Sequence, residues 1–261
     1  VDDLITPTTS FLSVGGMRIG PWFFPDWRAG GHGTTNVYHA IADSVNTFFY
    51  MIGGGNEQFV GMGVERLMHH AANYGFGSPT GIDIPGEGKG VLPILDSNWR
   101  LGDTYHFSIG QGPFAIPPIQ VAKAFVALAN GGTMYTPQVV QRLVDADGET
   151  IEFFEPIVEK ENIIQPDTLE IIRAGMRQTV TNGSATGWLN NVPVKVAVKT
   201  GTAQTGRKTY DGKDYLHSWT VAFAPYEDPD IVFVAIVEDI QEGQVGTLPI
   251  ARDVFQWYFS R

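Results

Sequence analysis

The 261-residue sequence predicts an α+β fold, with an antiparallel sheet flanked by helices. Helical periodicity dominates the first two-thirds of the chain, whereas alternating strand patterns gather near its end. The segments "HSWTVAFAP" and "IVFVAIVED" flank the turn "YEDPD" and should pair as an antiparallel hairpin. The strand–helix–strand alternation that builds parallel sheets is absent from the sequence, so the sheet is expected to be antiparallel.

The first half of the chain predicts short strands followed by helices. Residues 1–35 are rich in glycine, proline and aromatic residues, which favours turns and short strands over helix. Asn36 is suited to cap a helix, because apolar residues then recur at helical spacing, at Val37, Ile41, Val45, Phe48 and Phe49. A second helix is expected over 57–75, with Gly75 ending it, and a loop dense in glycine and proline over 77–93.

The second half predicts two further helices, a hairpin, the sheet and a terminal helix. A helix over 116–132 has proline in its first turn and Gly-Gly at its end, and a helix over 166–181 starts at Pro166. Between them, Asp147-Gly148 forms the tight turn of a hairpin. The remaining expected elements are the hairpin over 137–154, a strand over 193–200, a long polar loop over 203–216 and a helix over 251–260.

Composition limits the classes of function. The formal net charge of -11 argues against a nucleic-acid partner, because no basic stripe is available to neutralise phosphates. Zero cysteines exclude disulfides and thiolate metal sites. No stretch approaches the ~18 apolar residues that span a bilayer, and no signal peptide opens the chain. The protein is therefore soluble and intracellular, or its targeting segment lies outside this sequence; the opening residues, without a start methionine, favour a fragment.

The segment Lys199-Thr200-Gly201-Thr202 follows an alternating apolar run and resembles a socket for a carboxylate. The hydroxyls of Thr200 and Thr202 can donate to a carboxylate, and Lys199 supplies positive charge. Gly201 lets a ligand backbone lie close to the strand, and the N–H of Thr202 could point at a developing oxyanion. An ordinary strand end would carry the same residues. K-T-G is, however, one of three motifs found together in serine acyl-transfer enzymes, with S-x-x-K and S-D-N.

The triplet Ser44-Val45-Asn46 is the candidate for the second motif. Ser44 could be an ordinary polar residue of a helix. A break between two helices before "TFFYMIG" would instead expose Ser44 and Asn46 together. Ser44 Oγ could then relay a proton, and Asn46 could bind a substrate amide.

Five segments in order resemble the class B penicillin-binding D,D-transpeptidases, and most closely the penicillin-binding protein 2 members of cell elongation. They are "GGHGTTNVYHAIADSVNTFFY", "GSPTGIDIPGEGKGVLP", "FSIGQGPFAIPPIQVAKAFVALANGGTMYTPQVV", "VKTGTAQ" and "HSWTVAFAP". The resemblance implies a penicilloyl-serine transferase fold with its active site between the sheet and a helical lobe. It further implies that Ser44, Asn46 and Lys199 are catalytic, and that Thr200, Gly201 and Thr202 bind the substrate carboxylate.

The implied reaction cross-links peptidoglycan stem peptides. A serine attacks the penultimate D-Ala carbonyl of a pentapeptide, releases the terminal D-Ala, and passes the acyl group to an amine of a neighbouring strand. β-Lactams mimic the D-Ala-D-Ala end and leave the serine acylated. The implied partners are stem peptides, β-lactams and a membrane glycan polymerase, on the outer side of the bacterial cytoplasmic membrane.

The sequence departs from the family at its nucleophile, the serine of S-x-x-K. None of the seven lysines has a serine three residues before it; the residues found there are Gly86, Gln120, Ile157, Val192, Val196, Thr205 and Tyr210. We therefore expect residues 1–261 to be the larger, C-terminal part of a transpeptidase domain. The S-x-x-K helix, a pedestal domain and a membrane anchor would lie upstream of Val1. Alone, this chain is predicted to be inactive.

A second departure concerns metal. Some penicillin-binding protein 2 members hold a structural zinc through aspartates, a histidine and a cysteine near this entry loop. Asp26 and His32 occupy two of these places, but Val45 stands where the cysteine would be, and two ligands do not close a tetrahedral site. We therefore predict no metal and no cofactor, with His32 packing the loop and held by backbone contacts. His69-His70 are expected on a solvated helix face, and Gly110 and Gly112 in a tight turn under the site.

Two alternatives remain open from the sequence. A non-catalytic scaffold or binding protein of the same family could begin near Val1. A D,D-carboxypeptidase or β-lactamase on the same fold would differ in using water as acceptor, which these residues do not reveal.

Overall fold

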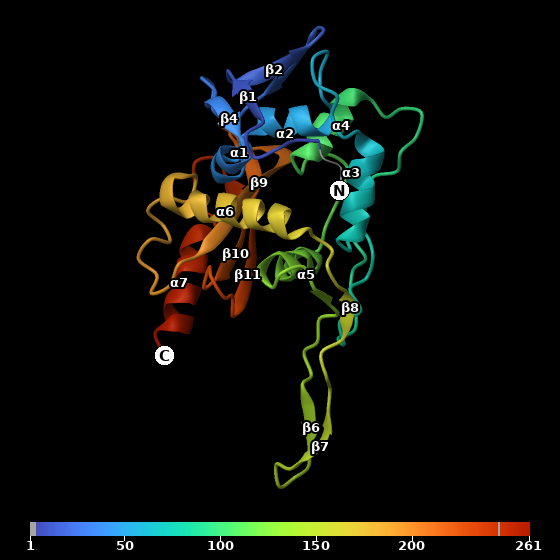
Figure 1. The fold of residues 1–261 in the computed structure, drawn as a ribbon, viewed down its shortest axis with the longest axis vertical. Helices are drawn as coiled ribbons and strands as arrows, with labels where there is room; N and C mark the ends of the chain where they lie inside the picture. The colour runs from blue at the N-terminus through green and yellow to red at the C-terminus, as the bar shows by residue number, and fades with distance from the viewer. Residues whose placement is uncertain (1–3, 245) are drawn as a thin grey trace.

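The computed structural model describes residues 4–244 and 246–261 (Figure 1). Its centre is a three-stranded antiparallel sheet of order β11-β10-β9. The strands are β9 (Ala197–Lys208), β10 (Asp214–Ala224) and β11 (Ile231–Gln241). In this sheet Ala222 lies opposite both Val198 and Phe233, so three apolar side chains meet on one face.

Helices cover both faces of the sheet, as Figure 1 shows. Those that pack on it are α1 (Val37–Asp43), α5 (Pro118–Ala129), α6 (Pro166–Asn182) and α7 (Leu248–Phe259), whereas α2 (Asn46–Gly53), α3 (Val64–Asn73) and α4 (Leu101–Ser108) lie beside it. Because side chains alternate along a strand, neighbouring residues serve different clusters. Val198 and Ala222 join a core cluster with Phe255 of α7. Ala197 and Phe223 join another with Ile41 of α1 and Met176 of α6.

Short strand pairs lie outside the central sheet. Near the N-terminus β1 (Ser10–Ser13) pairs with β4 (Gly33–Asn36), and β2 (Gly16–Ile19) pairs with β3 (Trp22–Pro25). After α5, β5 (Met134–Tyr135) pairs with β8 (Val158–Lys160), and β6 (Arg142–Val144) pairs with β7 (Thr150–Phe153). The β6–β7 hairpin extends far from the rest of the molecule (Figure 1).

Most of the expected elements are confirmed. Asn36 caps α1, accepting a hydrogen bond from the N–H of His39 at 3.1 Å. The helix break before "TFFYMIG" occurs between α1 and α2. Gly75, with φ of +85°, ends the third helix, and the hairpin turns at Asp147-Gly148. Within residues 4–244 and 246–261, none of the helices has the length and apolar character of a membrane span.

Two expectations were wrong. The helix expected over 57–75 begins only at Val64, because Gly61 packs against the backbone of Gly55; a Cβ there would lie 2.4 Å from the Gly55 nitrogen. The loop expected over 203–216 is instead mostly strand, since β9 runs to Lys208 and β10 starts at Asp214. Helix α4 and the β5–β8 pair were not predicted.

Candidate active site

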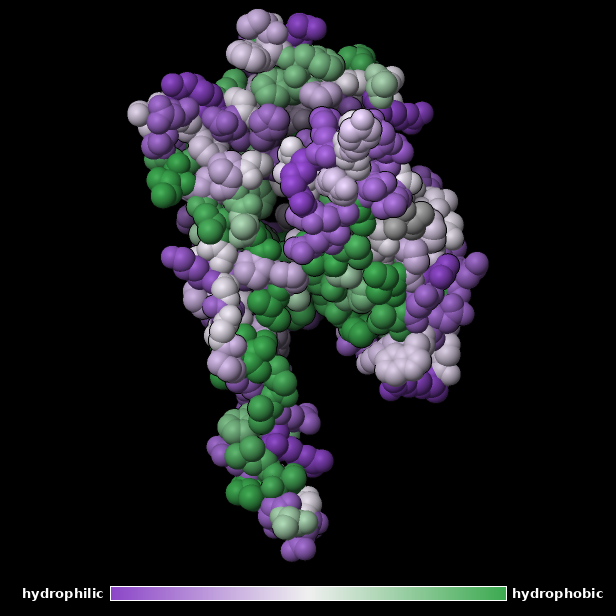
Figure 2. Space-filling model, turned by 180° about the vertical axis from the view of Figure 1, so that it is seen from behind, coloured by the Kyte–Doolittle hydropathy of each residue, from purple (hydrophilic) through white to green (hydrophobic). Residues whose placement is uncertain are grey.

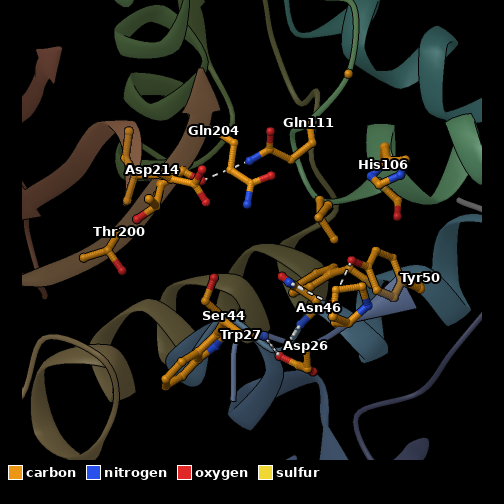
Figure 3. Close-up of a pocket in the computed structure, with 18 of the residues that line it drawn as sticks. Asp26, Trp27, Ser44, Asn46, Tyr50, His106, Gln111, Thr200, Gln204 and Asp214 are labelled. Atoms are coloured by element: carbon orange, nitrogen blue, oxygen red, sulfur yellow. Dashed lines mark hydrogen bonds between the residues drawn. The ribbon is translucent and has the colours of Figure 1, made fainter. Parts of the chain in front are cut away.

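A cleft of about 1230 Å³ separates the β9 edge from the corner between α1 and α2. Figure 3 shows side chains from both walls pointing into it. All six candidate site residues line the cleft: Ser44, Asn46, Lys199, Thr200, Gly201 and Thr202. All of them except Gly201 have polar side chains. Other lining residues include Trp27, Tyr50, His106, Gln111, Ser184, Asp214 and Glu242. The structure therefore brings together the two segments that the sequence singled out.

The closest contact across the cleft joins Lys199 and Ser44. The Nζ of Lys199 donates to Ser44 Oγ at 2.8 Å, and to its neighbour's carbonyl, Thr200 O, at 2.7 Å. Burial lowers the pKa of Lys199 to about 8, from an ordinary value of 10.5, because the ammonium loses water. A lysine with such a pKa exchanges protons near neutral pH, which suits proton transfer to or from Ser44.

The backbone at Ser44 makes this contact possible. Helix α1 ends at Asp43, and Ser44 takes a left-handed conformation, with φ of 55° and ψ of 50°. Val45 turns into the core and is fully buried, and Asn46 then starts α2. A left-handed residue that is not glycine is uncommon and must be held by its surroundings.

Asp26 and Trp27 hold this corner from both sides. The indole Nε1 of Trp27 donates to the carbonyl of Asp43 at 2.9 Å, at the end of α1. The carboxylate of Asp26 accepts from the N–H of Asn46 at 3.4 Å and from that of Thr47 at 3.1 Å, at the start of α2. Val45, the N-cap residue, makes no side-chain capping bond, so Asp26 supplies the negative charge that this helix start favours.

The opposite wall is the K-T-G strand. Thr200 Oγ1 shares a hydrogen bond with Ser184 Oγ at 3.0 Å, and Gln111 Nε2 donates to Thr202 O at 3.1 Å. A Cβ at Gly201 would lie 3.4 Å from Trp219 Cβ, so the sheet itself leaves room for alanine there. Packing alone therefore does not demand glycine at this position.

Asn46 and Tyr50 share a wall of the cleft. The Nδ2 of Asn46 makes one long bond, 3.5 Å, to Pro25 O, which leaves its amide oxygen for a ligand. Tyr50 donates to the same carbonyl at 3.1 Å. Burial, with the nearby Asp26 charge, raises the pKa of Tyr50 to about 12, so the phenol keeps its proton and acts as a fixed donor.

Asp26 and His32, which were considered and rejected as zinc ligands from the sequence, do not suit a metal. Asp26 is occupied by protein donors: Ser13 Oγ, Trp27 N, Asn46 N, Thr47 N and Thr47 Oγ1. His32 Nε2 lies 3.5 Å from Asp26 Oδ1, and Val45 supplies no ligand atom. Among the described residues, no group of three histidine, cysteine or carboxylate side chains could hold a metal ion. Asp26 and His32 therefore lack the further ligands that a closed tetrahedral zinc site requires.

The prediction for His32 was only partly right. Its ring packs against Trp27, with centroids 5.1 Å apart, and its backbone N–H donates to Ser13 Oγ at 3.2 Å. Neither ring nitrogen, however, has a hydrogen-bond partner among the described residues, so backbone contacts do not hold the ring. His69 is exposed on α3 and bonds Asn73 at 2.9 Å. Gly110 and Gly112 have φ of 77° and 108°, as a tight turn requires.

Sequence reasoning missed three contributors to the site. Gln111 lies between the two turn glycines, and the tight-turn prediction for Gly110 and Gly112 did not extend to it. Ser184 lies in a turn after α6, and nothing in its local pattern distinguishes it. Asp26 was considered only as a metal ligand, because its backbone partners lie about 20 residues away along the chain.

Comparisons with known proteins point to one family. Residues 4–256 match the family model described as the penicillin binding protein transpeptidase domain. The chain is 30% identical over 287 aligned residues to the peptidoglycan D,D-transpeptidase MrdA of Haemophilus influenzae, covering 100% of this chain and 42% of that protein. It is 33% identical over 243 residues to stage V sporulation protein D of Bacillus subtilis, covering 88% and 35%.

Solved structures show the same fold. The penicillin-binding protein PBP2 of Helicobacter pylori superposes with a TM-score of 0.79 at 28% identity, covering 98% of this chain and 46% of that one. The chain thus spans less than half the length of the relatives named here. The α+β fold expected from the sequence is the transpeptidase fold of these proteins. Because the family model matches nearly every residue, and relatives at 30% identity cover the whole chain, this chain belongs to the penicillin-binding protein transpeptidase domain family.

Proposed function

We propose that this chain forms the larger part of the active site of a serine-type peptidoglycan D,D-transpeptidase. The observation that carries the proposal is the bond of 2.8 Å from Lys199 Nζ to Ser44 Oγ, beside a hydroxyl-lined strand edge. Such an arrangement pairs a proton-transfer site with a carboxylate socket. A D-Ala-D-Ala peptide presents a scissile amide and a terminal carboxylate at matching places.

In this proposal Lys199, Ser44 and Asn46 act on the acyl-transfer step. A nucleophilic serine attacks the penultimate D-Ala carbonyl carbon and gives up its hydroxyl proton. Ser44 passes its hydroxyl proton to the nitrogen of the departing D-Ala and takes one from Lys199 in its place, and the proton given up by the nucleophile restores that of Lys199. The peptide C–N bond breaks, an ester forms, and an acceptor amine later displaces the serine oxygen. Asn46 binds the amide of the donor stem.

Thr200, Gly201 and Thr202 would bind the terminal carboxylate and position the reacting carbonyl. The two threonine hydroxyls donate to the carboxylate, and the positive charge of Lys199 adds attraction. The N–H of Thr202 would donate to the oxyanion of the tetrahedral intermediate. Gly201 leaves the strand edge open, so that an extended substrate backbone approaches closely.

The nucleophile would come from polypeptide upstream of Val1, in an S-x-x-K segment, since the 261 residues contain none. We propose that residues 1–261 are the larger, C-terminal part of the transpeptidase domain. Alone, the chain would bind but not form an acyl-enzyme. β-Lactams would acylate only the protein that includes the upstream serine.

Fluorescent penicillin tests both statements. The 261-residue chain is expected to give no covalent adduct, and the product of the uninterrupted gene to give one adduct per molecule. In that product Lys199→Ala should slow acylation by about 10²-fold or more. Lys195→Ala, at an exposed lysine of the same segment, should leave it unchanged. A stoichiometric adduct on the 261-residue chain would disprove the missing nucleophile; an unlabelled gene product would disprove the transpeptidase.

A second candidate is a non-catalytic scaffold or binding protein, which the absence of S-x-x-K in the sequence favours. The coding sequence upstream of Val1 distinguishes the two. An in-frame S-x-x-K a short distance before Val1 supports the enzyme, whereas a start codon there supports the scaffold.

We further propose the partners and location by analogy with relatives. Related solved structures include PBP2 of Helicobacter pylori in complex with MreC, and a peptidoglycan synthase complex that coordinates polymerization and crosslinking. Another is PBP2 of Pseudomonas aeruginosa in complex with WCK 5153. By this analogy the protein would act on the outer face of the cytoplasmic membrane, beside a membrane glycan polymerase.

A further inference from the structure

The hairpin that extends from the body of the molecule exposes apolar side chains along its length. We call residues 139–158 the arm; it contains β6 and β7. Figure 2 shows hydrophobic surface running down the arm. Its exposed large apolar residues, with more than a third of each side chain in solvent, are Val139, Val140, Leu143, Val144, Ile151, Phe153, Ile157 and Val158. Contiguous apolar surface of this kind marks sites of interaction.

The root of the arm is held firmly to the body. The Asp83 carboxylate accepts from the N–H groups of Val139 and Val140 at 2.8 and 2.9 Å. Beside it, buried Lys123 of α5 pairs with Glu159, and Lys160 donates to Asn73 O at 2.9 Å. Contacts with the loop at Asp83, with α5 and with the end of α3 therefore fix the direction in which the arm extends from the body.

The arm offers free strand edges. Among the described residues, β6 and β7 pair only with each other, so each has an outer edge of unpaired backbone groups. A two-stranded hairpin is marginal in water and gains stability from a third strand. Residues two apart share a face of a strand, so Ile151 and Phe153 point the same way, with Glu152 between them on the other face. Addition of a strand would pair one edge and cover these two side chains.

The charge of the arm selects the partner. Between residues 139 and 158 there are five carboxylates, Asp145, Asp147, Glu149, Glu152 and Glu155, and one cation, Arg142. A second copy of the arm would carry the same negative charge and be repelled. An anionic lipid surface would be repelled likewise. A polypeptide that alternates apolar and basic residues complements both the apolar face and the acidic one.

We propose that the arm is a docking site for an extended, basic segment of another protein, which adds as a third strand to the edge of the hairpin. The probe is a fluorescent nine-residue peptide that alternates valine and lysine. Its acidic control replaces each lysine with glutamate. Anisotropy measures binding to the full chain, and hydrogen exchange locates it.

The basic peptide is expected to bind saturably, with added protection of amides in residues 139–158, and the acidic peptide not to bind. Ile151→Lys should weaken binding by about tenfold or more, because it removes an apolar contact and repels the peptide. Ile94→Lys makes the same change at a side chain 87% exposed outside the arm and should have no effect.

Three results would overturn the proposal: equal binding of both peptides, protection outside the arm, or equal affinity of the two variants. Sedimentation gives a separate test. A dimer of the chain that Ile151→Lys dissolves would assign the arm to self-association instead. Because penicillin labelling plays no part in these measurements, their outcome is independent of the transpeptidase proposal.

Discussion

Replacing Lys199 with methionine should make the protein more stable while removing its proton-transfer group. Methionine has a similar length and fills the same space without a charge. In the native protein the Lys199 ammonium has lost water on folding, which is why its pKa falls to about 8. The unfolded chain restores that water. Burying the charged Lys199 ammonium therefore lowers the free energy of unfolding, and replacing it with methionine removes this desolvation cost.

The magnitude follows from the two pKa values, about 8 folded and 10.5 unfolded. Between them the unfolded state binds more protons than the folded state, so this group makes stability rise with pH. Integration gives a penalty of about 3 kcal/mol near pH 7 and about 1.4 kcal/mol near pH 9.5. Because Lys199 keeps some exposure to the cleft, these are upper limits. The lost bonds to Ser44 and Thr200 O, about 1 kcal/mol each, offset the variant's gain by a constant amount.

The assay is urea unfolding, followed by tryptophan fluorescence, at several pH values. Between about pH 7 and about pH 9.5 the free energy of unfolding of the native protein should rise by about 2 kcal/mol relative to that of Lys199→Met. Lys195→Met, at an exposed lysine of the same segment, controls for the loss of a lysine. Parallel pH curves for native protein and Lys199→Met would refute the reasoning, because the group would then carry its charge as readily folded as unfolded.

Three other predictions concern the corner, the strand and the metal. Asp26→Asn should lower the free energy of unfolding in urea by about 2–3 kcal/mol, because it weakens several buried hydrogen bonds. Ser13→Ala removes only one donor to Asp26 and should lower it by about 1 kcal/mol. The reverse ranking would contradict the role given to Asp26. Gly201→Ala should change stability by less than about 1 kcal/mol yet slow penicillin labelling of the gene product by about tenfold. If labelling stays normal, the strand edge is not where the ligand lies. Zinc or a chelator should shift Tm by less than about 1 °C, because a metal that does not bind the native state cannot stabilise it; a rise that depends on zinc concentration would show that a site exists.

The sequence predicts most of the helices, the hairpin of the central sheet and both walls of the cleft. Helical spacing identifies α1, α5 and α6, and the apolar alternation of residues 217–225 and 231–239 identifies the hairpin. Family resemblance then relates Ser44 to Lys199, which lie 155 residues apart. No local pattern could do so, because the contact depends on how the sheet packs against α1.

The ends of β9 and β10, helix α4 and the role of Asp26 were not predicted, because they depend on polar contacts that the hydrophobic pattern of the sequence does not reveal. The outer ends of β9 and β10 are polar. Lys208 of β9 pairs with Asp214 of β10 at 2.8 Å, and Arg207 of β9 pairs with Asp239 of β11. Helix α4 is short and contains Gly102, and Asp103 caps it by accepting from the Arg100 N–H at 2.7 Å. The role of Asp26 depends on backbone amides, which every residue but proline carries.

The bond from Gln111 to Thr202 also bears on solubility. Strand β9 is an edge of its sheet among the described residues, and an open edge can recruit the same strand of another molecule. The Gln111 side chain already occupies one carbonyl of that edge. A small ligand can enter the cleft beside the Gln111 side chain. A long strand from a second molecule, however, would find the Thr202 carbonyl already hydrogen-bonded. The Thr202 carbonyl on the β9 edge is in this way withheld from pairing with a second molecule.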